Sequence, residues 1–253
     1  SYVLGNPLRY VDPTGLCLGD PSDPDNPDAA CWGLFRNLNH QYEGIISVTG
    51  DWSYDELLLL QDALLMIANI FEGDLDTMEQ AFAPHTLGPW SELILHRTHW
   101  FRQVSLCQPP ACYARYKPAA HTLYVYDWFF GELAPGCRDC LVYGLLHEMG
   151  HALDYAGSRD TDDFFNAIGA TGSRLSVYIP VGMPYEAPPG ATDWYAATGA
   201  QEDFAQTFAY YVLAENNRYD TSLISQSIQV PSNERVQFFR SLVTDIRSIN
   251  LTR

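Results

Sequence analysis

The chain has 253 residues and carries 31 acidic against 14 basic side chains, which gives it a formal net charge of −17. Its length suits one domain with a large core or two small ones, and a hydrophobic content of 47% is ordinary for a globular protein. Because so acidic a protein repels phosphate backbones and anionic lipid heads, nucleic acids and membrane surfaces are disfavoured as partners.

The first segment, SYVLGNPLRYVDPTGL at residues 1–16, is dense in turn-forming residues and differs in composition from the rest. From Asn6 to Leu16 it resembles the last motif of the RHS-repeat-associated core, the β-cage of bacterial polymorphic toxins. The resemblance implies that residues 1–16 are the tail of this core and that a variable C-terminal effector follows, often released by self-cleavage near Leu16. The RHS core of the parent chain and an immunity protein are then expected partners. An ordinary turn-rich extension is the alternative.

Residues 17–50 are expected to form an acidic linker or N-terminal extension. Their segment GDPSDPDNPD, Gly19 to Asp28, is too polar and too rich in proline to bury a core. Calcium binding by its carboxylates is an alternative, although the central glycine and the distal glutamate of an EF-hand are missing. Since the chain starts without methionine, a basic stretch or an apolar stretch, we expect a fragment of a longer protein whose export signal, if any, lies elsewhere.

A compact domain is expected over residues 51–253. Ser53 and Glu56 stand in capping-box positions at the start of an apolar helix that runs to about Phe71. Polar residues interrupt this apolar run, which is also shorter than the roughly 20 residues of a membrane span, so we expect a core helix. A shorter helix is predicted over 75–82.

Two stretches rich in β-branched and aromatic residues, FRQVSLC at 101–107 and HTLYVYDWFF at 121–130, predict strands that form a hairpin. The connecting turn is expected between Cys107 and Cys112. Helical periodicity then predicts helices at 139–156, 162–169, 200–215 and 233–248, with a loop rich in glycine and proline over 170–199. The predicted fold class is α+β, mostly helical, with a small β-sheet or hairpin before the helix at 139–156.

Six cysteines stand at positions 17, 31, 107, 112, 137 and 140. The short spacings within the last four favour local disulfides between Cys107 and Cys112 and between Cys137 and Cys140. A structural zinc site with four cysteine ligands, or redox-active or free thiols, are the alternatives. Because disulfides persist in oxidising compartments, a secreted or cell-surface bacterial protein is expected, and delivery into a target cell remains an alternative.

The segment YGLLHEMGHALDYAG, residues 143–157, places His147 and His151 four positions apart, with Glu148 directly after the first. In a helix such positions share a face, so two imidazoles can bind one zinc ion (Zn²⁺) at about 2.0–2.1 Å. Glu148 lies beside that face. From there its carboxylate can accept a proton from a water molecule bound to the metal. Apolar neighbours argue against the alternative of three solvated side chains, and Gly150 leaves room for a close approach.

A catalytic zinc needs a third protein ligand and one open position. The metzincin extension fails, because Asp154 and Gly157 stand where that pattern requires glycine and histidine. Glu202 is the preferred third ligand, because QEDFAQTFAYYV reads as an amphipathic helix that aligns it with Gln206 and a small residue. This arrangement favours a close helix crossing. A carboxylate favoured only by the helix dipole is the alternative role for Glu202.

The rival third ligands are Asp203 and Glu186.

The segments HEMGHALDYAG and YAATGAQEDFAQTF resemble the catalytic core of gluzincin peptidases of the anthrax lethal factor type, over roughly residues 140–212. The resemblance implies a zincin-like fold with a zinc site and a general base. By this resemblance the zinc ligands are His147, His151 and Glu202, and the general base is Glu148.

Three further roles follow from the same resemblance. The hydroxyl of Tyr195 would face the oxyanion, and Asp154 would orient an imidazole from behind. The family has a second glutamate where this chain has Gln206. A role in proton transfer beside the metal is therefore not assigned to Gln206. A packed aromatic side chain is the alternative for Tyr195, and an ordinary helix carboxylate for Asp154.

The predicted function is a zinc-dependent metalloendopeptidase, the C-terminal effector of an RHS protein, acting on a peptide or protein substrate. An edge strand at Thr122–Asp127 is expected to bind that substrate by strand addition. The alternatives are a secreted peptidase that is not a toxin, and a non-catalytic binding module with a closed four-ligand metal site. The isolated histidines His40, His85 and His121 support no prediction.

Overall fold

The structure, a computed structural model, describes residues 17, 28–82, 92–98, 114–132, 137–157, 160–168, 171–172, 185–186, 200–218 and 230–250. The fold is mixed α+β, as the sequence predicts. The helices are α1 (Ala29–Gln41), α2 (Tyr54–Ile70), α3 (Leu75–Phe82), the 3₁₀ turn η2 (Pro118–Ala120), α4 (Asp127–Glu132), α5 (Arg138–Gly157), α6 (Asp160–Ala167), α7 (Ala200–Glu215) and α9 (Asn233–Asn250). The strands are β1 (Ile46–Gly50), β2 (Leu93–Thr98), β3 (Ala114–Lys117), β4 (Thr122–Tyr126), β5 (Thr171–Gly172) and β6 (Tyr185–Glu186).

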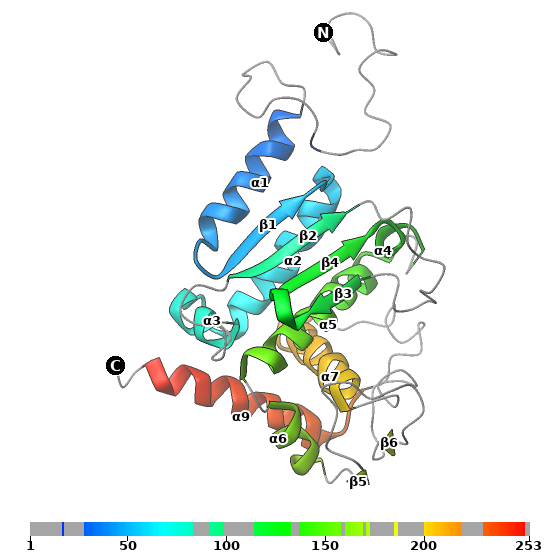
Figure 1. Cartoon of the computed structure of the whole chain (residues 1–253). Helices are drawn as coiled ribbons and strands as arrows, with labels where there is room; N and C mark the ends of the chain where they lie inside the picture. Colours follow the sequence, from blue (N-terminus) through cyan, green and yellow to red (C-terminus); the bar gives the residue numbers. More distant parts are fainter. Residues whose placement is uncertain are drawn as a thin grey trace, which may run out of the picture.

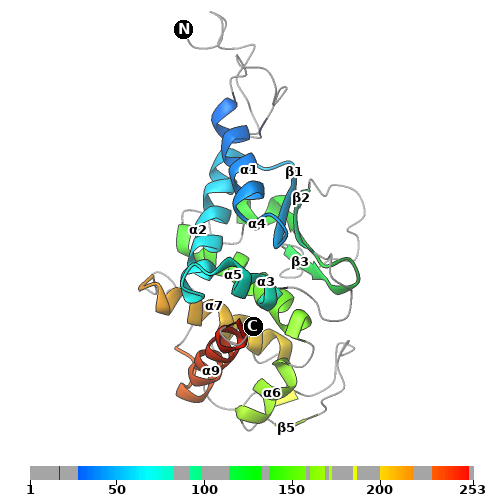
Figure 2. The ribbon, with the colours of Figure 1, turned by 90° about the vertical axis from the view of Figure 1, so that its left-hand side faces the viewer.

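The main sheet has four strands in the order β1-β2-β4-β3. The first three run parallel, with Ile46 opposite Leu93 and Leu95 opposite Leu123, and β3 runs antiparallel to β4. Alternate residues of β1, β2 and β3 are buried, as expected for strands with one face on the core, whereas in β4 every residue except Tyr124 is buried. Helices α2 and α5 lie on the same side of this sheet, while α6, α7 and α9 form a helical part below it (Figures 1 and 2).

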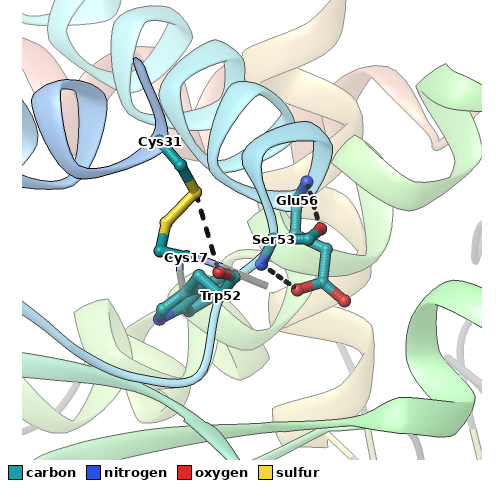
Figure 3. The surroundings of a disulfide bond; sticks show 5 residues. All are labelled: Cys17, Cys31, Trp52, Ser53 and Glu56. Atoms are coloured by element: carbon teal, nitrogen blue, oxygen red, sulfur yellow. Dashed lines mark hydrogen bonds between the residues drawn. A yellow bond between two sulfur atoms is a disulfide. The ribbon is translucent and has the colours of Figure 1, made fainter. Parts of the chain in front are cut away.

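Several local predictions are confirmed. Ser53 caps α2 through a complete capping box with Glu56, drawn in Figure 3, and the helix ends next to Phe71. The second helix occupies the predicted range 75–82, and α5, α6, α7 and α9 match the four later helices to within two residues at each end. Within the described residues, no helix is both long and apolar enough to cross a membrane.

The interpretation of residues 17–50 as a linker or extension is wrong for residues 29–50. These residues form α1 and β1, and β1 pairs with β2 in the main sheet. A disulfide between Cys17 and Cys31, drawn in Figure 3, ties the chain to this helix. The Cys17 amide also donates to the Trp52 carbonyl at 2.9 Å. Because β1 is short and its partner β2 lies far along the chain, no local pattern identified it.

The predicted hairpin is confirmed only in its second strand. Residues 101–107 and the turn between Cys107 and Cys112 lie outside the described residues. The second strand is β4, but its antiparallel partner is β3, reached through η2 and through His121, whose φ is 44°. The strand at Thr122–Asp127 was expected at an edge and instead lies between β2 and β3. In the described part of the sheet, β1 and β3 are the edges.

The second described disulfide joins Cys137 and Cys140 at the start of α5. Local pairing is therefore confirmed for these two cysteines. With their sulfurs joined to one another, neither thiolate is available to the four-cysteine zinc site that was the alternative.

Candidate metal centre

Helix α5 carries the two histidines of the predicted site on one face. The rings of His147 and His151 lie 4.8 Å apart between centroids and nearly perpendicular to one another. His147 is buried and His151 is partly buried, because their apolar neighbours Leu146, Met149 and Ala152 pack into the core. Two imidazoles therefore meet at one point at the boundary of the core.

Glu202, in the first turn of α7, completes this group. Its Oε2 lies 3.2 Å from Nε2 of His147 and 3.3 Å from Nε2 of His151. Two ligand atoms at about 2.0–2.1 Å from one tetrahedral zinc ion are about 3.3–3.4 Å apart, so both distances suit a shared ion. Two imidazole nitrogens and one carboxylate oxygen also suit other divalent transition metals, so this group could hold a metal ion but is not specific to zinc.

A close crossing of α5 and α7 brings Glu202 to the histidines. A Cβ atom on Gly150 would lie 2.9 Å from Cα and 3.3 Å from Cβ of Ala205, closer than side chains normally approach. Gly150 stands between the two histidines in sequence, and Ala205 stands one turn after Glu202. The absence of a side chain at position 150 therefore sets the distance between the imidazoles and the carboxylate.

Gly150→Ala tests this contact. The added methyl group forces the helices apart, so we expect zinc affinity to fall by at least about tenfold and stability to fall by about 1–3 kcal/mol. The matched control is Gly33→Ala in α1, where an added Cβ meets nothing within 4 Å. Zinc affinity, measured by competition with a coloured chelator, should be unchanged in the control. Equal affinities for both variants would contradict the role of Gly150.

The three groups also form a charged cluster in the absence of metal. Burial is the largest single effect and opposes protonation of His151, but the adjacent Glu202 carboxylate, together with Glu148 and Asp154, raises the pKa of His151 to about 9. Burial likewise favours the neutral form of Glu202, but His151 and His147 hold its pKa well below its usual range. Because metals bind neutral imidazoles, a metal bound here would release a proton from this cluster.

Glu148 lies beside the ligand group and contacts the edge of the sheet. Its Oε2 accepts a hydrogen bond from the backbone amide of Tyr116 in β3 at 3.0 Å. The carboxylate is therefore held between α5 and β3, beside the group of His147, His151 and Glu202 but not part of it. A carboxylate in this position could act on a molecule bound beside the three-residue group.

The structure separates the rival third ligands. Asp203 is fully buried, and its carboxylate accepts three hydrogen bonds from the guanidinium of Arg235 in α9, the shortest at 2.7 Å, so it points away from the histidines. Glu186 belongs to β6, and its side chain lies outside the described part of the structure. Only Glu202 joins the histidines among the described residues.

The remaining predicted site residues have different outcomes. Tyr195 lies outside the described residues. Asp154 is on α5, where its charge contributes to the raised pKa of His151, after burial and the larger effect of Glu202. Gln206 is buried on α7, and its backbone carbonyl accepts a hydrogen bond from the hydroxyl of Tyr143 at 3.1 Å.

Sequence reasoning missed two residues next to this site. Tyr116 falls between the two strands predicted for the hairpin, and His121 stood alone with no motif around it. No local signal distinguishes either residue, because their importance depends on the position of β3 against α5. Comparison with protein-family models and with curated proteins found no match.

Proposed function

We propose that this protein is a zinc-dependent metallopeptidase with a zincin-like active site. The observation that carries the proposal is the meeting of His147, His151 and Glu202, with the Glu148 carboxylate beside them. The resemblance of these segments to gluzincin peptidases of the lethal factor type supports the same assignment. Two histidines and one carboxylate are the ligand set of catalytic zinc sites such as that of thermolysin, in which water takes the fourth position, and this set favours catalysis over a closed structural site.

In this proposal each residue of the site has its own role in peptide hydrolysis. His147, His151 and Glu202 hold the ion, which when bound supplies a Lewis acid and acidifies a water molecule. Glu148 accepts a proton at its carboxylate and returns it to the leaving amine. Tyr195, assigned only by resemblance, would donate a hydrogen bond to the oxyanion. Asp154 would orient the His151 ring through its charge.

The substrate strand is proposed to add to β3. Because β4 lies inside the sheet, its backbone groups are already paired, whereas β3 has an open side in the described sheet. The Tyr116 amide donates to Glu148 and so points away from β4, towards that side. A peptide lying along β3 would therefore run past the Glu148 carboxylate.

The biological setting is a further part of the proposal. The RHS-like segment at residues 1–16 suggests the C-terminal effector of a polymorphic toxin, with an immunity protein as partner. The disulfides Cys17–Cys31 and Cys137–Cys140 suggest an extracellular or cell-surface location. A secreted peptidase that is not a toxin accounts for the same disulfides. Loss of viability in neighbouring cells would separate these two possibilities.

Metal content and activity, measured on the same purified protein, test the function. We expect one zinc ion per chain by plasma mass spectrometry and cleavage of a peptide library. A strong chelator should remove both, and added zinc should restore both. Bound zinc without cleavage would favour the non-catalytic binding module, and no bound metal after reconstitution would refute the proposal.

A further inference from the structure

We infer that Tyr116 and His121 position the Glu148 carboxylate. Their hydrogen bond fixes strand β3, and the backbone amide of Tyr116 in that strand donates a hydrogen bond to Glu148. This inference rests on the proposed function for its catalytic meaning. Its structural content is a chain of hydrogen bonds from the end of α3, through His121 and Tyr116, to Glu148. Neither residue belongs to the metal-binding group.

The directions of the hydrogen bonds follow from chemistry. Nε2 of His121 lies 2.8 Å from the carbonyl oxygen of Phe82, the last residue of α3. Because a carbonyl only accepts, Nε2 carries the hydrogen and donates it. Nδ1 of the neutral ring is then an acceptor, and the Tyr116 hydroxyl donates to it at 2.7 Å.

Burial makes this chain of hydrogen bonds rigid. His121 is 1% exposed and Tyr116 is 8% exposed, so water cannot replace either hydrogen bond easily. Burial also lowers the pKa of His121, which favours the neutral ring that these bonds require. The Tyr155 ring of α5 packs against both, with centroids 6.0 Å from Tyr116 and 6.4 Å from His121.

The backbone of Tyr116 links this buried pair to the active site. Its side chain is tied to α3 through His121, while its amide donates to Oε2 of Glu148 at 3.0 Å. The contact occupies one carboxylate oxygen and leaves Oε1 for proton transfer. Since rates fall steeply when a catalytic group is displaced by about 1 Å, a shift of β3 should act on the chemical step.

Tyr116→Phe removes the hydroxyl and keeps the ring and the amide. We expect kcat for peptide cleavage to fall about tenfold, KM to change by a smaller factor because β3 is also the proposed substrate strand, and zinc content to stay the same. The control is Tyr42→Phe, another buried tyrosine whose hydroxyl accepts from Gln41 at 3.2 Å, away from β3. Equal kcat losses in both variants, or a change in KM alone, would overturn the inference.

Amide hydrogen exchange gives a readout that does not depend on activity. The amide of residue 116 should exchange faster in Tyr116→Phe and in Glu148→Ala than in the wild-type protein, and Tyr42→Phe should leave it unchanged. Unchanged exchange in Tyr116→Phe would refute the positioning role even if the protein is a peptidase. If the wild-type protein has no peptidase activity but the amide of residue 116 exchanges faster in Tyr116→Phe, the proposed function is refuted. The structural link between β3 and Glu148 is then still supported.

Discussion

Glu148→Gln is expected to lower kcat for peptide cleavage by about 10²–10⁴-fold while zinc stays bound. The amide has nearly the same shape as the carboxylate and can still accept the Tyr116 amide hydrogen bond through its oxygen, but it cannot take a proton. The three groups proposed to bind the metal are unchanged in this variant. The expected result is therefore a folded, zinc-loaded protein without useful activity.

Two further variants make this result specific. Glu202→Ala removes a proposed ligand, so it should lose both zinc and activity. Glu215→Gln alters an exposed carboxylate at the end of the same helix and should retain both. Plasma mass spectrometry and steady-state kinetics on the same samples separate these cases. Full activity in Glu148→Gln would exclude this residue as the general base.

Arg235→Ala is expected to lower the free energy of unfolding by about 3–5 kcal/mol. Arg235 and Asp203 are 1% and 0% exposed, and their closest nitrogen and oxygen lie 2.7 Å apart. Removing the guanidinium leaves the Asp203 carboxylate buried without its cation. Urea unfolding of the metal-free protein measures this effect without the added stability that a bound metal would give.

A surface ion pair on the same helix is the control. Arg240 of α9 contacts Glu215 at 3.0 Å, but its side chain is 52% exposed. Arg240→Ala should therefore cost only about 0.2–1 kcal/mol. The double replacement of Asp203 by Leu and Arg235 by Met should recover most of the stability lost in Arg235→Ala, because it leaves no unpaired buried charge at these two positions. Similar decreases in the free energy of unfolding for Arg235→Ala and Arg240→Ala would contradict the larger contribution expected of the buried ion pair.

The sequence by itself determined the local parts of this protein. The capping box at Ser53 and the helical periodicities predicted α2, α3, α5, α6, α7 and α9, because neighbours within a helix are set by spacing along the chain. The same rule placed His147 and His151 side by side. The tyrosine assigned by resemblance, Tyr195, lies outside the described residues, so its role stays a prediction.

Only the tertiary structure decided which elements meet. The sequence favoured Glu202 and left Asp203 as a rival, and the structure brings Glu202 to the histidines, because α7 crosses α5 at Gly150 and turns the aspartate towards α9. The tertiary structure also placed β4 inside the sheet and joined β1 to β2 across the intervening helices. Pairing between distant segments depends on packing of whole elements, and a periodic pattern states only which face of an element is buried. For the same reason the link from His121 to Glu148 was not readable from the sequence.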